Sequence, residues 1–446
     1  MSEATVPEAS DLTDVAGPAA APAPPEEPRR LMPLVAALAA ALFSLGGNAI
    51  SLVALPIIAL DLTGSPLWAG VAGVFATVPL VIGGAFGGVL VDRFGYRASS
   101  IAADVASGLT VLAVPVLHAT VGLPFWALLG LAFLGGLLDP PGDTAKTSLT
   151  PDLAALARVP IARAAGAQSA VQRTATMIGA GTAGVLIGLS GPMVALVVDA
   201  VGFGIAALLV LLFVPARLAA RARAAADVEG DGEAVAPDAP ADSGGFVAGL
   251  RFVVRSPLLR AIILLVTLTN AIDAAGLTVL KPLYASEVLD DRAMLGFMVG
   301  TFAAGALVGS AVFGVVGHRW SGRWMFAICF VLAGVPPYLA MALEAPAPVL
   351  LPVLAASGLA AGALNPMIST AMYGLIPDGM RARVFGVLTA GVTATMPLGA
   401  FLGGAAAQAF GLVPTVAACA LLYAVLGASP LVLRSFDGLA AARPRD

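Results

Sequence analysis

Residues 138–152 read LDPPGDTAKTSLTPD, and residues 364–378 read LNPMISTAMYGLIPD. The two segments share Leu, Pro, Thr, Ala, Leu, Pro and Asp at a constant offset of 226 positions, which is 364 less 138. A second match follows each segment, because Thr-Ala-Thr-Met occurs at 174–177 and again at 393–396. Self-similarity of this kind is the signature of an internal repeat. The chain is therefore predicted to contain two related halves in the same orientation.

The composition indicates that both halves lie in a membrane. Of the 446 residues, 59% are hydrophobic and 11% are charged, against about 45 to 50% and about 25% in soluble domains. Apolar runs of about 20 residues, long enough to cross a bilayer, recur along the chain. A run such as AIILLVTLTNAI (261–272) lacks the alternation of a β-barrel strand. We therefore predict an all-α membrane protein.

The apolar runs, separated by short polar or Pro/Gly-rich breaks, predict twelve spans. They cover 32–60, 66–91, 98–118, 122–149, 164–190, 192–214, 257–285, 293–317, 322–343, 347–376, 383–409 and 411–434. This division gives an N-terminal six-helix bundle at 31–214 and a C-terminal six-helix bundle at 257–434. Residues 1–30 and 435–446 are predicted tails, and 215–256 a flexible linker.

The distribution of basic residues predicts the orientation. Of the 23 Lys and Arg residues, only Lys281 and Arg292 are placed at the outer surface, and Arg173 is placed inside a span. The others fall in loops or helix ends on the side that holds both termini and the linker. Because positive loops stay in the cytoplasm, both termini are expected to be cytoplasmic, in a bacterial plasma membrane.

Charged groups inside the apolar spans are the first candidates for function, because a charge at mid-bilayer costs at least about 2.5 to 3.5 kcal/mol. Asp139 and Arg173 reach similar depths in the fourth and fifth spans and are predicted to pair, either as a coupling element or as a structural ion pair. Asp273 is the candidate protonatable carboxylate, with hydrogen bonding to neighbouring helices as the alternative. Asp104 and Asp199 lie nearer helix ends and are assigned to helix packing.

The segment GGAFGGVLVDRFGYR (83–97) follows the second span. Its Gly88, Asp92, Arg93, Gly95 and Arg97 resemble the signature loop of the major facilitator superfamily. The resemblance covers nearly the whole chain and implies two pseudo-symmetric six-helix bundles that alternate access to a central cavity.

In that superfamily the first, fourth, seventh and tenth helices line the cavity. The resemblance therefore implies that five residues line this cavity: Asn48, Asp139, Asn270, Asp273 and Asn365.

The signature loop also implies a conformational latch. Asp92 is expected to pair with Arg381 or Arg383 at the start of the eleventh span and so to hold the outward-open state. The alternative is an ordinary charged turn.

Three further phrases are similar to the multidrug and macrolide-efflux branch of the superfamily, which also holds siderophore exporters: LPIIALDLTGSPLWAG (55–70), PDLAALA (151–157) and RARVFGVL (381–388). They imply secondary export of amphipathic small molecules, with protons as the coupling ion. Two departures concern that coupling: the fourth span lacks the basic residue that many drug/proton antiporters carry there, and GAGTAG (179–184) replaces their usual Gly-Pro pair. The alternatives are an importer of a nutrient or metabolite and a non-transporting sensor.

Other classes of function are not expected. No G-x-x-x-x-G-K-[ST] loop is present, so ATP hydrolysis by this chain is excluded. The two histidines, His118 and His318, are far apart, so we expect no metal site, and the sparse polar content gives no enzyme nucleophile with its base. The expected partners are a small-molecule substrate, protons and the lipid bilayer. No cofactor or nucleic acid is expected, and a monomer suffices for the fold.

Overall fold

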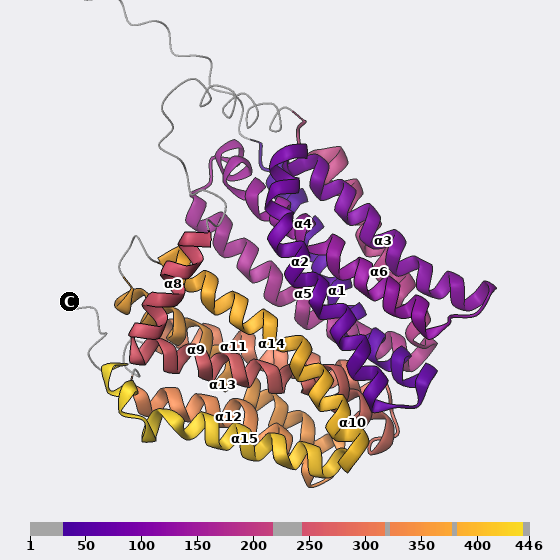
Figure 1. The fold of residues 1–446 in the computed structure, drawn as a ribbon. Coiled ribbons are helices and arrows are strands. Elements are labelled where there is room, and N and C mark those ends of the chain that lie inside the picture. Colours follow the sequence, from indigo (N-terminus) through magenta and orange to yellow (C-terminus); the bar gives the residue numbers. More distant parts are fainter. Residues whose placement is uncertain (1–29, 217–242, 317–321, 377–380, 440–446) are drawn as a thin grey trace, which may run out of the picture.

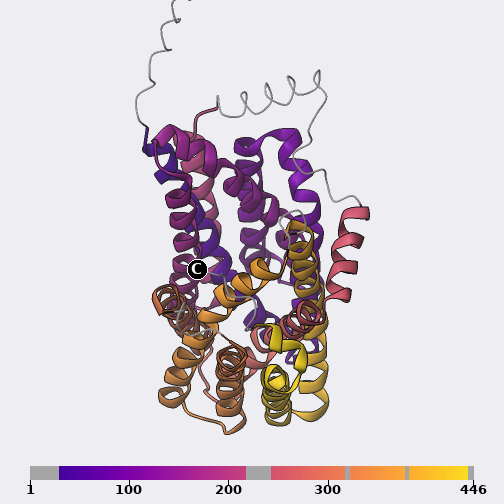
Figure 2. The same cartoon turned by 90° about the vertical axis from the view of Figure 1, so that its left-hand side faces the viewer.

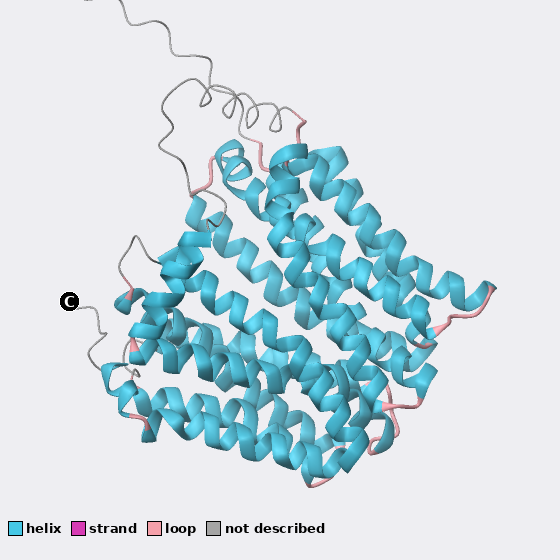
Figure 3. Cartoon of the chain, in the orientation of Figure 1, coloured by secondary structure: helices cyan, strands magenta, loops and turns pink. Residues whose placement is uncertain are grey.

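The computed structural model describes residues 30–216, 243–316, 322–376 and 381–439, and these residues are almost wholly helical (Figures 1 and 3). The first half contains six long helices. They are α1 (Met32–Thr63), α2 (Pro66–Phe94), α3 (Tyr96–Thr120), α4 (Phe125–Ala157), α5 (Ile161–Ser190) and α6 (Pro192–Phe213).

The second half repeats this arrangement after a short helix, α8 (Ser243–Arg255). Its first span is continuous but is built from three segments: α9 (Pro257–Ala275), the π-helical turn η1 (Gly276–Leu280) and α10 (Lys281–Glu287). Five long helices and a terminal 3₁₀ turn follow. They are α11 (Met294–Val316), α12 (Arg323–Ala342), α13 (Ala347–Leu375), α14 (Arg381–Phe410), α15 (Leu412–Val432) and η3 (Arg434–Leu439).

Ten spans in the described residues are long and apolar enough to cross a membrane. The other two long helices are α2, whose segment Pro66–Leu80 is apolar, and α5, which carries more polar side chains. Tryptophans lie near both ends of the spans, with Trp126 at the start of α4 and Trp324 at the start of α12, as in the aromatic belts of membrane proteins. The predicted all-α membrane fold is confirmed.

Three local predictions need correction. α4 continues to Ala157, eight residues past the predicted end at 149. The helix α8 lies inside the range predicted as a flexible linker. Lys281, predicted at the outer end of the seventh span, is partly buried instead, with its ammonium 5.6 Å from the centre of the Phe302 ring of α11.

The two halves pack in the same way, as the repeat predicted. In the first half α2 packs on α4 and α3 on α6; in the second half the equivalent pairs are α11 on α13 and α12 on α15. Two equivalent interfaces join the halves, α2 with α14 and α5 with α11. We call the end at which α1 begins and α6 and α15 end the linker face, and the opposite end the distal face. The halves meet toward the distal face and diverge toward the linker face (Figure 1).

Glycines set the close approach of neighbouring helices. In α11, a Cβ on Gly305 or Gly309 would collide with the backbone of α13, and a Cβ on Gly358 or Gly362 of α13 would collide with the backbone of α11. Small residues at such contacts allow the backbone packing that drives helix association in lipid, where the hydrophobic effect is absent.

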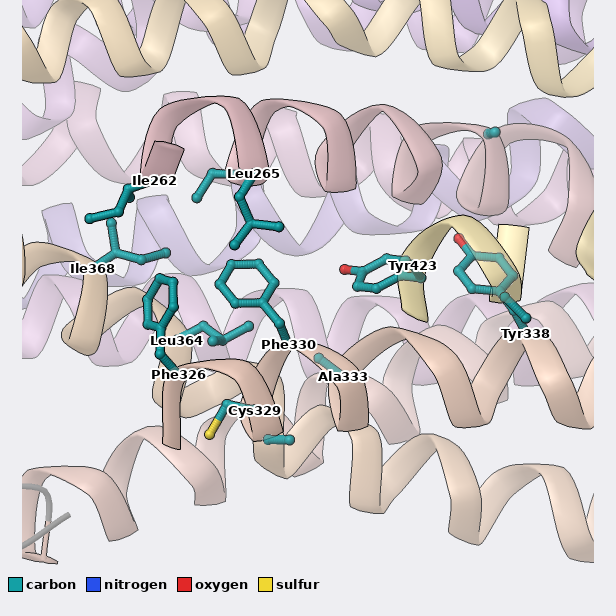
Figure 4. Close-up of a cluster of buried hydrophobic side chains, with 14 of the residues drawn as sticks. Ile262, Leu265, Phe326, Cys329, Phe330, Ala333, Tyr338, Leu364, Ile368 and Tyr423 are labelled. Atoms are coloured by element: carbon teal, nitrogen blue, oxygen red, sulfur yellow. The ribbon is translucent and has the colours of Figure 1, made fainter. Parts of the chain in front are cut away.

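Aromatic and aliphatic side chains fill the core of the second half. Phe326 and Phe330 of α12 pack against Leu364 of α13 beneath α9, with their rings 5.0 Å apart (Figure 4). Tyr338 and Tyr423 continue this row toward the distal face, where polar groups of α9 meet them.

We predict that Gly309→Ala and Gly362→Ala each destabilise the protein, because the added methyl group meets backbone that cannot move aside. Overpacking of this kind costs about 1 to 3 kcal/mol. Thermal unfolding of the purified protein in detergent measures the loss. Gly204→Ala in α6 is the matched control, because a Cβ there meets nothing within 4 Å. Equal melting temperatures for all three variants would contradict the role of these glycines.

Candidate substrate cavity

A cavity of about 360 Å³ lies among the helices of the first half. Thr278 of η1 and Met396 of α14 close it from the second half. Most of its lining is aliphatic, and Asn48 of α1 and Asp139 of α4 supply a polar pair within it. Asn48 Nδ2 donates a hydrogen bond of 2.6 Å to Asp139 Oδ2. This arrangement suits an amphipathic molecule with one polar anchor point.

One side of α1 carries a polar stripe with a spacing of four and then three residues, which places the three side chains on one face of the helix. Each donates a hydrogen bond to a carboxylate on a different helix of the same half. The pairs are Ser44 with Asp104 of α3, Asn48 with Asp139 of α4, and Ser51 with Asp199 of α6. α1 therefore ties α3, α4 and α6 together through buried polar contacts.

Lys146 of α4 joins this network. Its Nζ lies 2.6 Å from Asp104 Oδ1 and 2.8 Å from Ser44 Oγ, and the Lys146 and Asp104 side chains are only 5% and 2% exposed. Asp139 and Asp143 precede Lys146 by two turns and one turn of α4, and the ammonium attracts both carboxylates. Lys146 is thus ion-paired with Asp104, and the carboxylates of Asp139 and Asp143 lie near enough to be attracted by the same ammonium group. Asp104 Oδ2 is buried and makes no hydrogen bond within the described part of the chain.

The predicted ion pair between Asp139 and Arg173 is wrong. Arg173 is exposed on α5, and its Nη1 donates a hydrogen bond of 3.0 Å to Ser310 Oγ of α11, in the other half. Ser310 in turn donates to the Gly362 carbonyl of α13 at 2.7 Å. Equal depth in the membrane did not bring Arg173 and Asp139 together, because the two side chains project in different directions from their helices.

The candidate residues of the second half do not reach Asn48 and Asp139. Asp273 accepts hydrogen bonds from Tyr423 at 3.1 Å and Tyr338 at 3.5 Å, although its side chain remains accessible. Asn270 donates to the Val266 carbonyl of its own helix at 2.8 Å. Asn365 is exposed on α13. Asp273 therefore belongs to a second polar cluster, formed with two tyrosines.

The predicted latch lies largely outside the described side chains. Nothing is described for the side chains of Asp92 and Arg381, or for the surroundings of Gly88, so their pairing stays a prediction. Two further members of the signature loop have structural positions. Gly95 adopts a φ of 85° between α2 and α3, and Arg97 Nη2 donates to the Leu211 carbonyl of α6 at 2.7 Å.

The other two predicted members of the latch lie at the same end of the molecule. Arg93 is exposed at the end of α2, with its guanidinium 5.8 Å from the centre of the Phe94 ring. Arg383 is exposed in the first turn of α14.

At the distal face the two halves are joined directly. Arg292, between α10 and α11, forms a salt bridge of 2.8 Å with Asp61 of α1. Ser65 Oγ donates to Gln408 Oε1 of α14 at 2.8 Å.

Close packing accompanies these polar links. A Cβ on Gly70 of α2 would lie 2.7 Å from the Ala400 carbonyl of α14, and one on Gly184 of α5 would lie 2.8 Å from the Ala293 carbonyl. The distal face is therefore closed.

Toward the linker face the same helices expose small and polar side chains. In α5 these are Ser169 and Gln172, and in α14 they include Thr389. This exposure agrees with the divergence of the two halves seen in Figure 1. The molecule is closed at one end and open at the other, as expected for one state of an alternating-access transporter.

The fold and the cavity thus define a polytopic membrane protein of two related six-helix bundles around a largely apolar cavity. A family model described as the Major Facilitator Superfamily matches residues 37–290 and 263–445. The chain belongs to this superfamily.

Comparisons with individual proteins agree with this membership. The multidrug efflux pump Tap of Mycolicibacterium fortuitum is 30% identical over 402 residues, which cover 89% of this chain and 94% of that protein. The protein of the same name from Mycobacterium tuberculosis is 29% identical over 388 residues, or 86% and 89% of the two chains.

Solved structures show the same fold at low sequence identity. The nucleoside transporter NupG has a TM-score of 0.71 at 12% identity, with 90% of this chain and 98% of that chain covered. A POT family transporter in complex with 5-aminolevulinic acid has a TM-score of 0.64 at 14% identity, covering 93% and 96%.

Sequence reasoning missed Lys146 and Asp143. The fourth span was predicted to lack the basic residue that many drug/proton antiporters carry there, although Lys146 falls within its predicted limits of 122–149. The structure corrects this, because Lys146 is a buried base in α4. The available signal was its spacing: Asp139, Asp143 and Lys146 recur at four and three residues and so share one face of a helix.

We predict that Lys146→Met lowers thermal stability strongly, because it leaves Asp104 buried without its partner. Breaking a buried pair in this way costs about 3 to 5 kcal/mol, whereas replacing both partners by apolar residues is often neutral. The double variant Lys146→Met with Asp104→Leu should therefore recover most of the loss. Melting of the purified proteins in detergent tests both, and a single variant as stable as the parent protein would exclude a structural role for the pair.

Proposed function

We propose that the protein is a secondary transporter that exports amphipathic small molecules, such as drugs or natural products, from a bacterial cell. The observation that carries the proposal is the cavity, with its mainly aliphatic lining, a few hydroxyl groups and the Asn48–Asp139 pair. A sugar or a phosphorylated metabolite would require many hydrogen-bond donors or paired cations, whereas an apolar molecule with one polar group matches this lining. The relatives named as multidrug efflux pumps support the same assignment.

We further propose that protons are exchanged at the buried charges of the first half. Asp104, Asp139 and Asp143 share one cation, Lys146, so the cluster lacks positive charge. Uncompensated charge is costly inside a membrane. A proton, or the cationic group of a bound molecule, would supply the missing charge, and competition between the two would couple export to the proton gradient. Asp273, between Tyr338 and Tyr423, is a second candidate carboxylate.

The proposed orientation places the linker face in the cytoplasm. In the described residues, Arg292 is the one basic side chain in a distal loop, whereas Arg158, Arg255 and Arg434 lie at the linker face. This asymmetry follows the positive-inside rule. The structure would then be the inward-open state, which loads its cargo from the cytoplasm or the inner leaflet.

We predict that Asp139→Asn abolishes proton-coupled export and leaves the fold intact, because the amide keeps the shape of the side chain but cannot exchange a proton. The measurement is accumulation of a lipophilic dye in energised everted vesicles, together with proton release on addition of the dye. Asp290→Asn, at an exposed position in a distal loop, is the matched control.

The variant Asp273→Asn is measured in the same assay, so that the contributions of Asp139 and Asp273 to proton coupling can be compared. Coupled export that persists in Asp139→Asn but is lost in Asp273→Asn would assign the proton to the second cluster. Accumulation in right-side-out cells instead of everted vesicles would show an importer.

We predict that Asp61→Arg opens the distal face, because it replaces the attraction to Arg292 by repulsion, and that the swap Asp61→Arg with Arg292→Asp restores closure. The readout is labelling of a cysteine introduced at Thr278, on the cavity wall, by an impermeant maleimide added outside the cells, with Cys329 and Cys419 replaced by alanine. Labelling should rise in the single variant and return to the parent level in the swap. Unchanged labelling in both variants would argue against this gate.

A further inference from the structure

The helix α8 differs from the membrane spans in its direction and in the side chains that it exposes. It runs across the end of α9 at the linker face, instead of along the bundle, and it lies at the periphery of the molecule (Figures 1 and 2). A turn at Ser256 and Pro257 separates it from α9. A Cβ on Gly249 would lie 2.8 Å from the Arg383 carbonyl, so α8 rests closely on the first turn of α14.

The side chains of α8 are described from residue 248 onward and divide into stripes. Val253 is buried against the protein, on the same side as Gly249. Leu250 and Val254, one turn apart, are 42% and 53% exposed. A helix of the bundle with these side chains would simply face lipid tails. α8 instead lies crosswise at the ends of the spans, where its exposed apolar stripe meets the edge of the bilayer.

A basic stripe lies beside the apolar one. Arg251 and Arg255, also one turn apart, are exposed. Arg260, in the first turn of α9, is exposed as well and donates from Nη1 to the Val254 carbonyl at 3.4 Å. The sequence contains no Asp or Glu between Asp242 and Asp273, so the charged side chains of α8 and of the first turns of α9 are all basic.

We propose that α8 is an interfacial helix that binds acidic phospholipids of the leaflet at the linker face. The apolar stripe of Leu250 and Val254 enters the acyl boundary, and the guanidinium groups of Arg251, Arg255 and Arg260 bind the phosphate headgroups. An adjacent apolar and basic stripe on a helix that lies in the membrane plane matches a lipid surface in both shape and charge. A soluble anion would use the arginines but would leave the apolar stripe in water.

The contact of Gly249 with Arg383 gives this binding a mechanical consequence. α14 borders the opening between the halves at the linker face and packs on α2 toward the distal face. Acidic lipid held by α8 therefore acts on the end of α14 that must move when the linker face closes. Transport is expected to depend on acidic lipid through this helix.

The experiment uses the full-length protein in nanodiscs of phosphatidylcholine with or without phosphatidylglycerol. Spin-labelled lipids measure the preference of the lipid shell for phosphatidylglycerol. Arg251→Gln with Arg255→Gln should lower that preference by about thirtyfold, since each of the two arginines near an anionic surface contributes about 1 kcal/mol. Arg434→Gln, which removes an exposed arginine at the end of α15 on the same face, should leave it unchanged.

Two further variants test whether a lower preference reflects misfolding and whether the apolar stripe contributes to lipid binding. Arg251→Lys with Arg255→Lys keeps the charge and should retain most of the preference, which checks that loss in the glutamine variant does not reflect misfolding. Leu250→Gln with Val254→Gln should weaken lipid binding if the apolar stripe enters the bilayer. An unchanged preference in the arginine-to-glutamine variant would overturn the proposal. Full competition by dissolved glycerol phosphate would also overturn it, in favour of a soluble anion site.

Discussion

The cost of polar groups in a bilayer is the constraint on which the rest of this structure depends. Backbone amides and carbonyls without water must bond within their own helix, which leaves helices as the elements of the fold. The same cost applies to side chains, and the chain meets it with a polar stripe on one helix, α1. Through Ser44, Asn48 and Ser51 this stripe gives a hydrogen-bond donor to a carboxylate on each of three neighbouring helices. The first half is therefore organised around α1.

The two halves share the same pattern of helix packing but differ in the side chains that this packing encloses. In the first half the polar contacts surround a cavity and leave one ammonium among three carboxylates. In the second half the equivalent region is a packed core of aromatic and aliphatic side chains, and Asp273 meets two tyrosines at its end. The repeat thus preserves the framework of helix contacts, while the chemistry at equivalent positions has diverged. The cavity is asymmetric as a result, with its anchor groups on one side.

The fold could be predicted almost completely from the sequence, because a bilayer imposes a simple rule of length and hydrophobicity on each span. The predicted limits of α6 and α13 agree with the structure to one residue at each end. The site was harder, because depth along a helix says nothing about the direction of a side chain around it. Asn48 and Asp139 were both expected to line a cavity and do so, whereas Arg173 points to Ser310 in the other half. Lys146 shares one helix face with Asp139 and Asp143, and this relation becomes evident only when the spacing of the three residues is read along α4.

Among the described residues, the polar links across the distal face are few and weak. A single partly exposed ion pair, Asp61 with Arg292, and one hydrogen bond, Ser65 with Gln408, accompany the packing of glycine against backbone. An exposed ion pair is worth only about 0 to 1 kcal/mol. The ion pair therefore contributes little to this closure, which depends mainly on the packing of α2 against α14 and of α5 against α11.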